Sequence, residues 1–294
     1  PFSIVVDTHD VARDTLHAHL DLLAAASWLP SIAPMAAQSF ASLAVAHGEE
    51  AAPLLEGFLA RLSQPADHHV DTVEAFAKTL SATAIDYDSD HVFPYDHDAL
   101  AALCATLLDG SVAITDRTRE EILKGCSLVV SRDPDSLAPH VDAIATALDR
   151  VTDPGPQRLA AELLAQVVAV VDSIPTPVLS TLLDTLEGVD DDHLQVLLST
   201  LLRDIAVKGD AFEDDPSPTL AAYPHLLVDA LDQDASDATS AILDCIGVLS
   251  ENGYRDSFAP HWRTILEQVA HDDPDVGVAA LRATAVLGPS RDLQ

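Results

Sequence analysis

The sequence predicts an all-α chain: a right-handed α-α superhelix of about six helical hairpins plus capping helices. Three observations predict it. Apolar residues recur at i, i+3, i+4 and i+7 in segment after segment, and the alternation typical of strands is nearly absent beyond residues 3–6. Short Asp-, Pro- and Gly-containing turns separate these segments. Prolines also recur at one position relative to the apolar stripe, which indicates a structural repeat.

Periodicity and turn residues together place fourteen helices along the 294 residues. In chain order they cover about 8–28, 31–47, 49–62, 66–84, 97–109, 116–131, 135–150, 155–172, 175–187, 190–206, 218–232, 235–251, 256–271 and 274–287.

The second helix of most hairpins has a proline near its start. Pro53, Pro139, Pro177 and Pro260 are each followed by apolar residues at +2, +5, +6 and +9. Proline fits the first helical turn, where its missing N–H costs nothing, and the four apolar positions fall on one helical face. Pro224 has the proline with a shifted stripe. From Pro139 the successive spacings are 38, 47 and 36 residues, which predicts one hairpin per interval.

The first helix of each hairpin has its own pattern, clearest near the end of the sequence. Asp273 precedes Pro274, small apolar residues follow at helical spacing, and Gly288 closes the segment. Asp is a favoured N-cap, Pro a favoured first-turn residue and Gly a favoured C-terminal residue. Asp153 and Pro154 form a looser copy.

At these residues the sequence resembles the HEAT-repeat family, in particular its short HEAT-like repeats, over about residues 31–288. The resemblance implies a HEAT-like, armadillo-type α-solenoid and carries little information about activity. It implies one domain, 1–294, with a cap at 1–30, about six A/B repeats at 31–271 and a terminal half-repeat at 274–294. The helices at 97–109 and 218–232 depart from the pattern, and a plain helical bundle with coincidental prolines is the alternative.

Composition narrows the class of protein further. The chain has 48 acidic against 15 basic residues, a formal charge of −33, and 48% apolar residues. It is too apolar for a disordered chain and too negative to favour nucleic acid or an acidic membrane. No window of 18 residues is free of charged or strongly polar groups, and the first residues lack a basic leader, so we expect a cytoplasmic protein without membrane insertion.

The types of charged residue indicate the salt concentration to which the protein is adapted. There are 37 Asp against 11 Glu, and 12 Arg against 3 Lys. This bias resembles that of proteins from salt-in halophilic archaea. At about 1 M ionic strength the Debye length is about 3 Å, so the repulsion among excess carboxylates is largely screened. An acidic protein from an ordinary cell is the alternative.

Motifs for chemistry are mostly absent. The sequence contains no GxGxxG, GxxxxGK[ST], GxSxG, HExxH or CxxC pattern. Among enzymes built on HEAT-like repeats, the di-iron hydroxylases use His-Glu dipeptides and the DNA glycosylases use a basic groove. Neither feature occurs here. The sequence therefore predicts no catalytic residue, no cofactor and no enzyme.

Metal ligands are weakly indicated at best. Residues 86–98 begin like a calcium loop, but His91 stands where Gly is needed and His97 where a bidentate Glu belongs. A solvated acidic loop is favoured over a cation site, and zinc at His68, His69, His91 and His97 is disfavoured. Pro-His pairs recur at 139–140, 224–225 and 260–261, which favours helix-start packing over a histidine ladder. The three cysteines lie on apolar stripes and are predicted to be buried packing residues.

Two long connections, at about 85–96 and 207–217, are predicted on one edge of the stack. They carry four candidate partner-binding aromatics, Tyr87, Phe93, Tyr95 and Phe212. The alternative is that these rings pack back over the helices. Trp262 heads an apolar stripe and is predicted to be core.

The sequence thus favours a non-catalytic protein–protein scaffold or adaptor in a high-salt cytoplasm. Its partner is unidentified, and the terminal half-repeat offers an apolar strip to a partner or to a second copy in a homodimer. The alternative is an enzyme or cofactor-lyase-type protein with an acidic and histidine site on the concave face, where His140 or His225 would meet Asp side chains.

Overall fold

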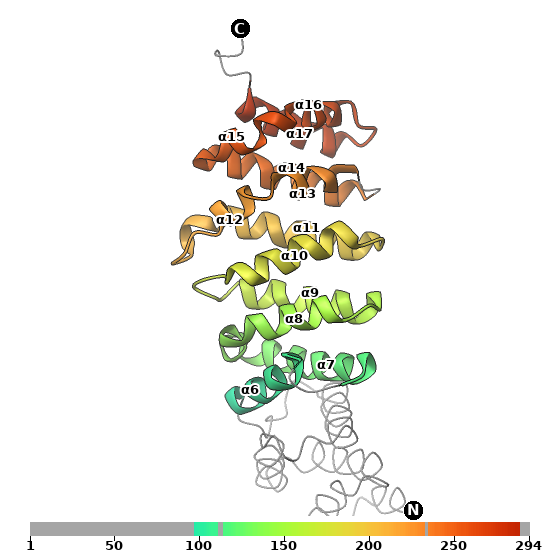
Figure 1. Cartoon of the computed structure of the whole chain (residues 1–294), viewed down its shortest axis with the longest axis vertical. Coiled ribbons are helices and arrows are strands. Elements are labelled where there is room, and N and C mark those ends of the chain that lie inside the picture. Colours follow the sequence, from blue (N-terminus) through green and yellow to red (C-terminus); the bar gives the residue numbers. More distant parts are fainter. Residues whose placement is uncertain (1–96, 111–113, 233–234, 289–294) are drawn as a thin grey trace, which may run out of the picture. The chain divides into compact units, whose positions relative to one another are not determined.

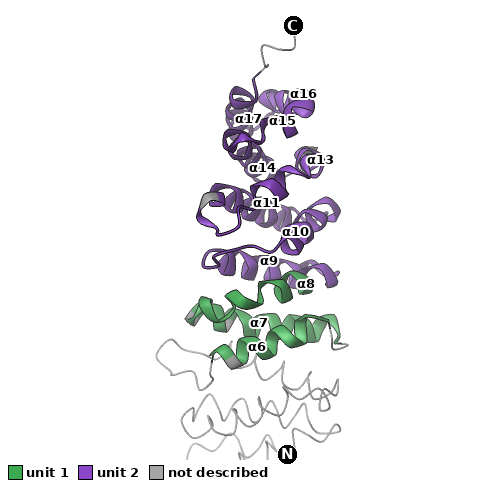
Figure 2. Cartoon of the chain, turned by 60° about the vertical axis from the view of Figure 1, so that its left-hand side comes forward, with its two compact units in different colours: residues 1–147 green, residues 148–294 purple. Residues whose placement is uncertain are grey.

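A computed structural model describes residues 97–110, 114–232 and 235–288. Within these residues every regular element is helical. The chain divides into two compact units, residues 1–147 and 148–294, which are described separately (Figure 2). The helices predicted before residue 97, the cap at 1–30 and the connection at 85–96 lie outside the described residues.

The described part of the first unit consists of α6 (His97–Leu108), α7 (Asp116–Arg132), the 3-10 turns η2 (Pro134–Ser136) and η3 (Ala138–His140), and the start of α8 (Val141–Arg150). Helices α6 and α7 pack against each other. Leu100, Leu107, Ile122 and Leu123 are fully buried there. Thr115 caps α7, its side-chain oxygen accepting a hydrogen bond from the Thr118 amide at 3.2 Å.

The second unit begins within α8 and continues with nine α-helices. These are α9 (Pro154–Val168), α10 (Thr176–Gly188), α11 (Asp192–Val207), α12 (Ser217–Ala221), α13 (Pro224–Asp229), α14 (Ser236–Leu249), α15 (Arg255–Phe258), α16 (Trp262–Glu267) and α17 (Pro274–Leu287). Short turns connect them: η4 (Gly209–Ala211), η5 (Ala230–Asp232), η6 (Ser250–Tyr254), η7 (Ala259–His261) and η8 (Gln268–Ala270).

Four helices of this unit, α9, α11, α14 and α17, are stacked in series, and we call them the A helices. Helix α9 contacts α11, α11 contacts α14, and α14 contacts α17, as Figure 1 shows. Their N-cap residues are Asp153, Asp191, Ala235 and Asp273. The Asp273 and Asp153 caps predicted from sequence are confirmed: each carboxylate accepts a hydrogen bond from a backbone amide two residues on.

The proline-started helices pack beside the A helices, and we call them the B helices. In the second unit α10 contacts α11 and α13, α13 contacts α14, and α16 contacts α17. The apolar stripe predicted after Pro177 is buried at all four positions, namely Leu179, Leu182, Leu183 and Leu186. Burying a large aliphatic side chain contributes about 1.5–3 kcal/mol. Burial of this stripe therefore contributes much of the free energy that keeps α10 packed against its neighbours.

Most predicted boundaries agree with the structure to within two residues. The helix predicted at 256–271 divides into α15 and α16 at η7, and the first residues of the one predicted at 135–150 form η2 and η3 instead. The helix predicted at 218–232 is wrong as a single helix, because it divides into α12 and α13 at Pro224. Proline lacks the N–H for an intrahelical bond, and Tyr223 before it is forced out of helical geometry (φ −117°, ψ 51°). The helix predicted at 155–172 ends earlier, at Val168. None of the described helices is both long and apolar enough to cross a bilayer.

Candidate functional site

A cleft of about 660 Å³ lies in the second unit. It lies where α8 and α10 end and α9 and α11 begin. We call it the acidic cleft. Four carboxylates, two valines and other turn residues line it: Leu148, Asp149, Val151, Thr152, Pro154, Gln157, Asp184, Thr185, Gly188, Val189, Asp190 and Asp191.

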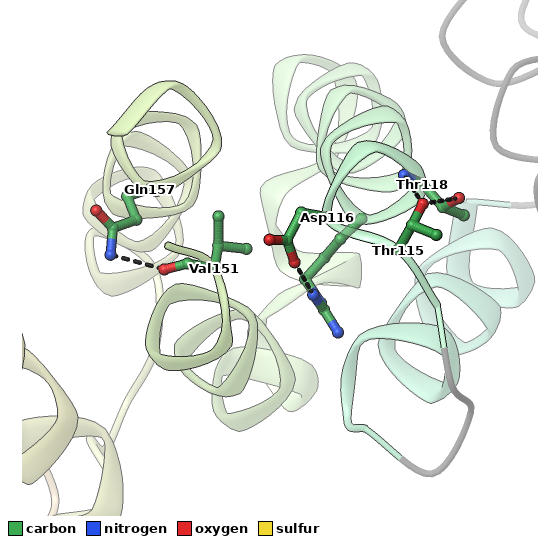
Figure 3. A network of polar contacts seen from close by, with 6 residues as sticks. Thr115, Asp116, Thr118, Val151 and Gln157 are labelled. Carbon is green, nitrogen blue, oxygen red and sulfur yellow. Dashed lines mark hydrogen bonds and ion pairs between the residues drawn. The ribbon is translucent and has the colours of Figure 1, made fainter. Parts of the chain in front are cut away.

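A short pattern, Val-x-Asp-x-x-x-Gln, builds both sides of the acidic cleft. It occurs at residues 151–157 and again at 189–195, one hairpin later. In each copy the Asp caps an A helix, and the Gln amide reaches back to the carbonyl of the Val. Gln157 Nε2 donates to Val151 O at 2.7 Å (Figure 3), and Gln195 Nε2 donates to Val189 O at 2.9 Å. The two turns therefore contain the same hydrogen bond from a Gln side chain to a Val carbonyl.

The first unit carries comparable polar contacts at the start of α7, also drawn in Figure 3. Thr115 and Thr118 share a hydrogen bond between hydroxyls at 2.9 Å, and Arg119 Nη1 donates to Asp116 Oδ1 at 2.7 Å. Arg119 takes the place that Gln157 takes on α9, four residues after the N-cap. The same helix-start position is thus polar and locally bonded in both units.

An ion pair joins the two A helices beside the acidic cleft. The Arg158 guanidinium donates to both carboxylate oxygens of Asp191, with Nε to Oδ1 at 2.8 Å. The same carboxylate accepts a hydrogen bond from the Leu194 amide at 2.8 Å. These two donors lower the pKa of Asp191 to about 2, and the pair raises the pKa of Arg158. Asp191 is therefore anionic at all ordinary pH values and already neutralised.

The other carboxylates of the acidic cleft have no such partner. Asp149, Asp184 and Asp190 are exposed, and in the described part of the chain no cation forms an ion pair with them. Accessible apolar surface in the same cleft comes from Pro154, which is exposed, and Val189, which is half-buried. Chemically, the cleft offers an apolar floor and an anionic rim, which suits a basic side chain with an aliphatic stem.

The predicted partner-binding aromatics are not gathered here. Tyr87, Phe93 and Tyr95 lie outside the described residues. Phe212 is only 8% exposed, so the alternative that its ring packs back over the helices holds for this residue. Its connection is fastened to the preceding turn by the Glu213 amide, which donates to Asp172 O at 2.7 Å. Trp262 is half-buried rather than fully in the core.

The Pro-His pairs begin helices, as their sequence position predicts. Pro139 and Pro260 lie in the 3-10 turns η3 and η7, and Pro224 opens α13. Burial lowers the pKa of His140, and the Asp98 carboxylate opposes that shift. His225 is exposed beside Tyr223, with ring centroids 6.4 Å apart. Among the described residues no three His, Cys, Asp or Glu side chains are placed to share a metal ion.

The prediction of buried packing cysteines is confirmed. Cys104, Cys126 and Cys245 are all buried and unpaired by disulfides. A hydrogen bond with Cys126, together with burial, raises the pKa of Cys104, and burial raises that of Cys245 to about 12. The Cys104 and Cys245 thiols are therefore neutral, which does not suit a nucleophile.

Comparison with known proteins bears on the fold alone. No protein-family model matches the chain, and no curated protein matches it. It is similar to a crystal structure of an engineered protein from the Northeast Structural Genomics Consortium, with a TM-score of 0.57 and 16% identity over 97% of this chain and 70% of the other. A second engineered protein from the same consortium gives a TM-score of 0.48 and 14% identity over 85% of this chain and 96% of the other.

Proposed function

We propose that this chain is a right-handed HEAT-like α-solenoid that binds another protein and catalyses no reaction. The observation that carries the proposal is the acidic cleft, which is formed by two successive turns of the same design. A stack of hairpins repeats such turns along one edge, and repeat proteins use extended surfaces of this kind to bind partners. The high-salt cytoplasm remains part of the proposal, supported by the Asp-rich, Lys-poor composition.

The mechanism we propose is docking of a partner segment with a basic side chain in the acidic cleft. The aliphatic stem of an Arg or Lys would cover Pro154 and Val189, and its charged head would meet Asp184 or Asp190. Because Arg158 already neutralises Asp191, the remaining carboxylates supply the selectivity for a cation. In molar salt Coulomb attraction between exposed groups is weak, so apolar contact supplies most of the affinity.

The test is affinity capture from a lysate held at the salt concentration of the source cell, with three versions of the full chain as bait. The proposal expects a protein captured by the wild type and by Asp237→Arg, an exposed charge reversal on α14, but lost with Asp190→Arg. Circular dichroism verifies that all three baits are equally helical. If no protein is retained in high salt, or if Asp190→Arg retains the same protein, the proposal is overturned.

A further inference from the structure

The turn η6, between α14 and α15, contains the one asparagine of the sequence. The chain has 37 Asp but a single Asn, Asn252, and the residue after it is Gly253. Both residues are exposed. The Asn252 side chain forms no hydrogen bond with the residues that the structure describes. Its amide is therefore open to water and free to change rotamer.

The backbone leaves helical geometry at this pair. Helix α14 ends at Leu249, and Gly253 has φ 100° and ψ 1°, in the left-handed region that residues with a side chain rarely adopt. A Cβ added at Gly253 would meet no atom within 4 Å, so nothing crowds the backbone on that side. Segments at helix ends open locally at little cost in free energy. The Asn252–Gly253 pair can therefore sample conformations that a helix interior excludes.

An Asn-Gly pair of this kind can react with itself. The backbone nitrogen of Gly253 attacks Cγ of Asn252 and forms a new C–N bond. The bond from Cγ to Nδ2 then breaks, and Nδ2 leaves as ammonia with the proton that the Gly253 nitrogen gives up. The product is a cyclic succinimide. Because glycine has no side chain, the attacking nitrogen is as little hindered as a backbone nitrogen can be.

Water completes the reaction by reopening the succinimide. Addition of water at Cγ breaks the new C–N bond and leaves Asp at position 252. Addition at the backbone carbonyl carbon instead leaves isoaspartate, in which the main chain runs through Cβ and Cγ. The sum of the steps is amide plus water giving carboxylic acid plus ammonia, so neither an oxidant nor a cofactor is needed.

A second helix end shows that the turn itself does not require an amide. Among the described residues, φ is positive only at Gly253 and at Gly110, where it is 85°. Gly110 follows Asp109, directly after α6. Asp therefore suffices before a glycine of this conformation. The two pairs differ in reactivity, because an ionised carboxylate repels a nucleophile and has no neutral leaving group comparable to ammonia.

We propose that Asn252 is a site of spontaneous deamidation, at which the Gly253 nitrogen and then water convert the single Asn of the chain to aspartate and isoaspartate. The reaction replaces a neutral amide with a carboxylate, so each modified chain becomes more negative by one charge. It takes place within the second unit and is independent of the acidic cleft and of any partner.

The surroundings of the turn oppose the new charge. It would lie beside Glu251 and just beyond the C-terminal end of α14, where the helix dipole is negative. Burial and the Asp215 carboxylate raise the pKa of Tyr254, so another carboxylate already acts on this turn. The Arg255 guanidinium is held by a hydrogen bond to Gly288 O. The modified turn should therefore open more readily than the unmodified one.

The test compares the full chain with a synthetic peptide of residues 248–256, both incubated in the same high-salt buffer at neutral pH. Digestion and mass spectrometry follow the segment that contains residue 252. Because a helix end opens at little cost, the full chain should react no more than about 10-fold more slowly than the peptide. Both Asp and isoaspartate should appear at position 252. An intact Asn252 in the full chain after the peptide has reacted would overturn the proposal, and so would Asp without isoaspartate, which indicates direct hydrolysis.

Controls within the chain and one variant separate this chemistry from general damage. The exposed Gln166 of α9 should keep its amide, because a glutamine must close a larger ring. Asn252→Gln should abolish the reaction at position 252 for the same reason, and circular dichroism verifies that this variant is equally helical. Labelling by an isoaspartate methyltransferase gives an independent readout. A methylation signal of equal size in Asn252→Gln would place the isoaspartate elsewhere, for example at Asp109, and would overturn the proposal.

Discussion

The junction between α9 and α11 carries a charged pair at its N-terminal end, whereas the junction between α14 and α17 is closed by small apolar residues. At the first, Arg158 binds the N-cap carboxylate Asp191 of the next helix. At the second, Gly247 faces Ala283, and the α14 N-cap residue Ala235 makes no side-chain cap bond. The contact between α9 and α11 and the contact between α14 and α17 are thus stabilised by different interactions.

The difference matters because the two forces respond differently to solvent. The Arg158–Asp191 pair is partly exposed, with side chains 40% and 23% accessible, so salt screens it and acid can remove it. The contact between α14 and α17 is apolar, so neither salt screening nor protonation acts on it directly. The following substitutions measure each junction separately.

The largest effect is expected at Leu243, a fully buried residue of α14, the helix that packs against α17. Leu243→Ala removes buried apolar surface and leaves a cavity, so the free energy of unfolding should fall by about 2–5 kcal/mol. Urea unfolding in low and high salt checks this, and the loss should be the same in both. Val207→Ala, at an exposed site, should change little. A loss that varied strongly with salt would contradict the apolar account of this junction.

A smaller loss of stability is expected from enlarging Ala283, whose Cα would lie 3.8 Å from a Cβ added at Gly247. Ala283 is fully buried, so Ala283→Leu forces α14 and α17 apart and should cost about 1–3 kcal/mol. The same change at the exposed Ala165 of α9 is the control and should be nearly neutral. Equal effects at the two sites would mean that close approach of the helices is unimportant.

The ion pair between α9 and α11 should affect the stability of the fold mainly in a pH-dependent way. Arg158→Gln removes the strongest donor to Asp191, so the pKa of that carboxyl should rise from about 2 toward its ordinary value of 3.8. A carboxyl group whose pKa is lower in the folded state stabilises the fold at pH values above its pKa in the unfolded chain. This stabilisation is lost as the pH falls through the pKa of the group in the folded state. The stability difference between wild type and variant should therefore be full above about pH 4 and vanish near pH 2.

Carboxyl NMR titration of Asp191 and thermal unfolding at each pH measure this pair of effects. Arg203→Gln, which removes an exposed pair with the neighbouring Asp204, is the control and should leave Asp191 unchanged. An Asp191 pKa that stayed near 2 in Arg158→Gln would assign the shift to the Leu194 amide instead.

The smallest effect is expected at Ser199, a fully buried residue of α11 whose hydroxyl has no hydrogen-bond partner. Ser199→Ala removes an unsatisfied polar atom and should leave stability unchanged or raise it by up to about 1 kcal/mol. Urea unfolding measures the change, with Thr284→Ala as the contrast because the Thr284 hydroxyl donates to Ala280 O at 2.8 Å. A clear loss at Ser199 would indicate a bound water.

Sequence reasoning predicted the helices well because helix starts and apolar stripes are local signals. Asp153 and Asp273 cap the helices they were expected to cap, and the stripe after Pro177 is buried. Pro224 was expected to carry the same proline with a shifted apolar stripe, but its division of one helix into α12 and α13 was missed. The proline itself carried that signal, since it cannot donate the bond that a continuous helix would need.

The acidic cleft was missed because it depends on groups brought together by packing. Arg158 and Asp191 are separated by 33 residues in sequence, and nothing local marks them as partners. The repeated Val-x-Asp-x-x-x-Gln pattern was the available signal, because two copies one hairpin apart indicate two equivalent turns. Phe212 shows the opposite difficulty: an aromatic ring in a long connection can be a docking residue or a packing residue, and only the fold distinguishes them.

Serial packing of the A helices also bears on how the second unit forms. Successive A-helix N-caps, at residues 153, 191, 235 and 273, are only about 40 positions apart, so each contact closes a short stretch of chain. Proteins whose contacts are local in sequence fold quickly and can open one element at a time. Backbone amides of α17 should therefore exchange with deuterium sooner than those of α11, which is enclosed by an A helix on each side.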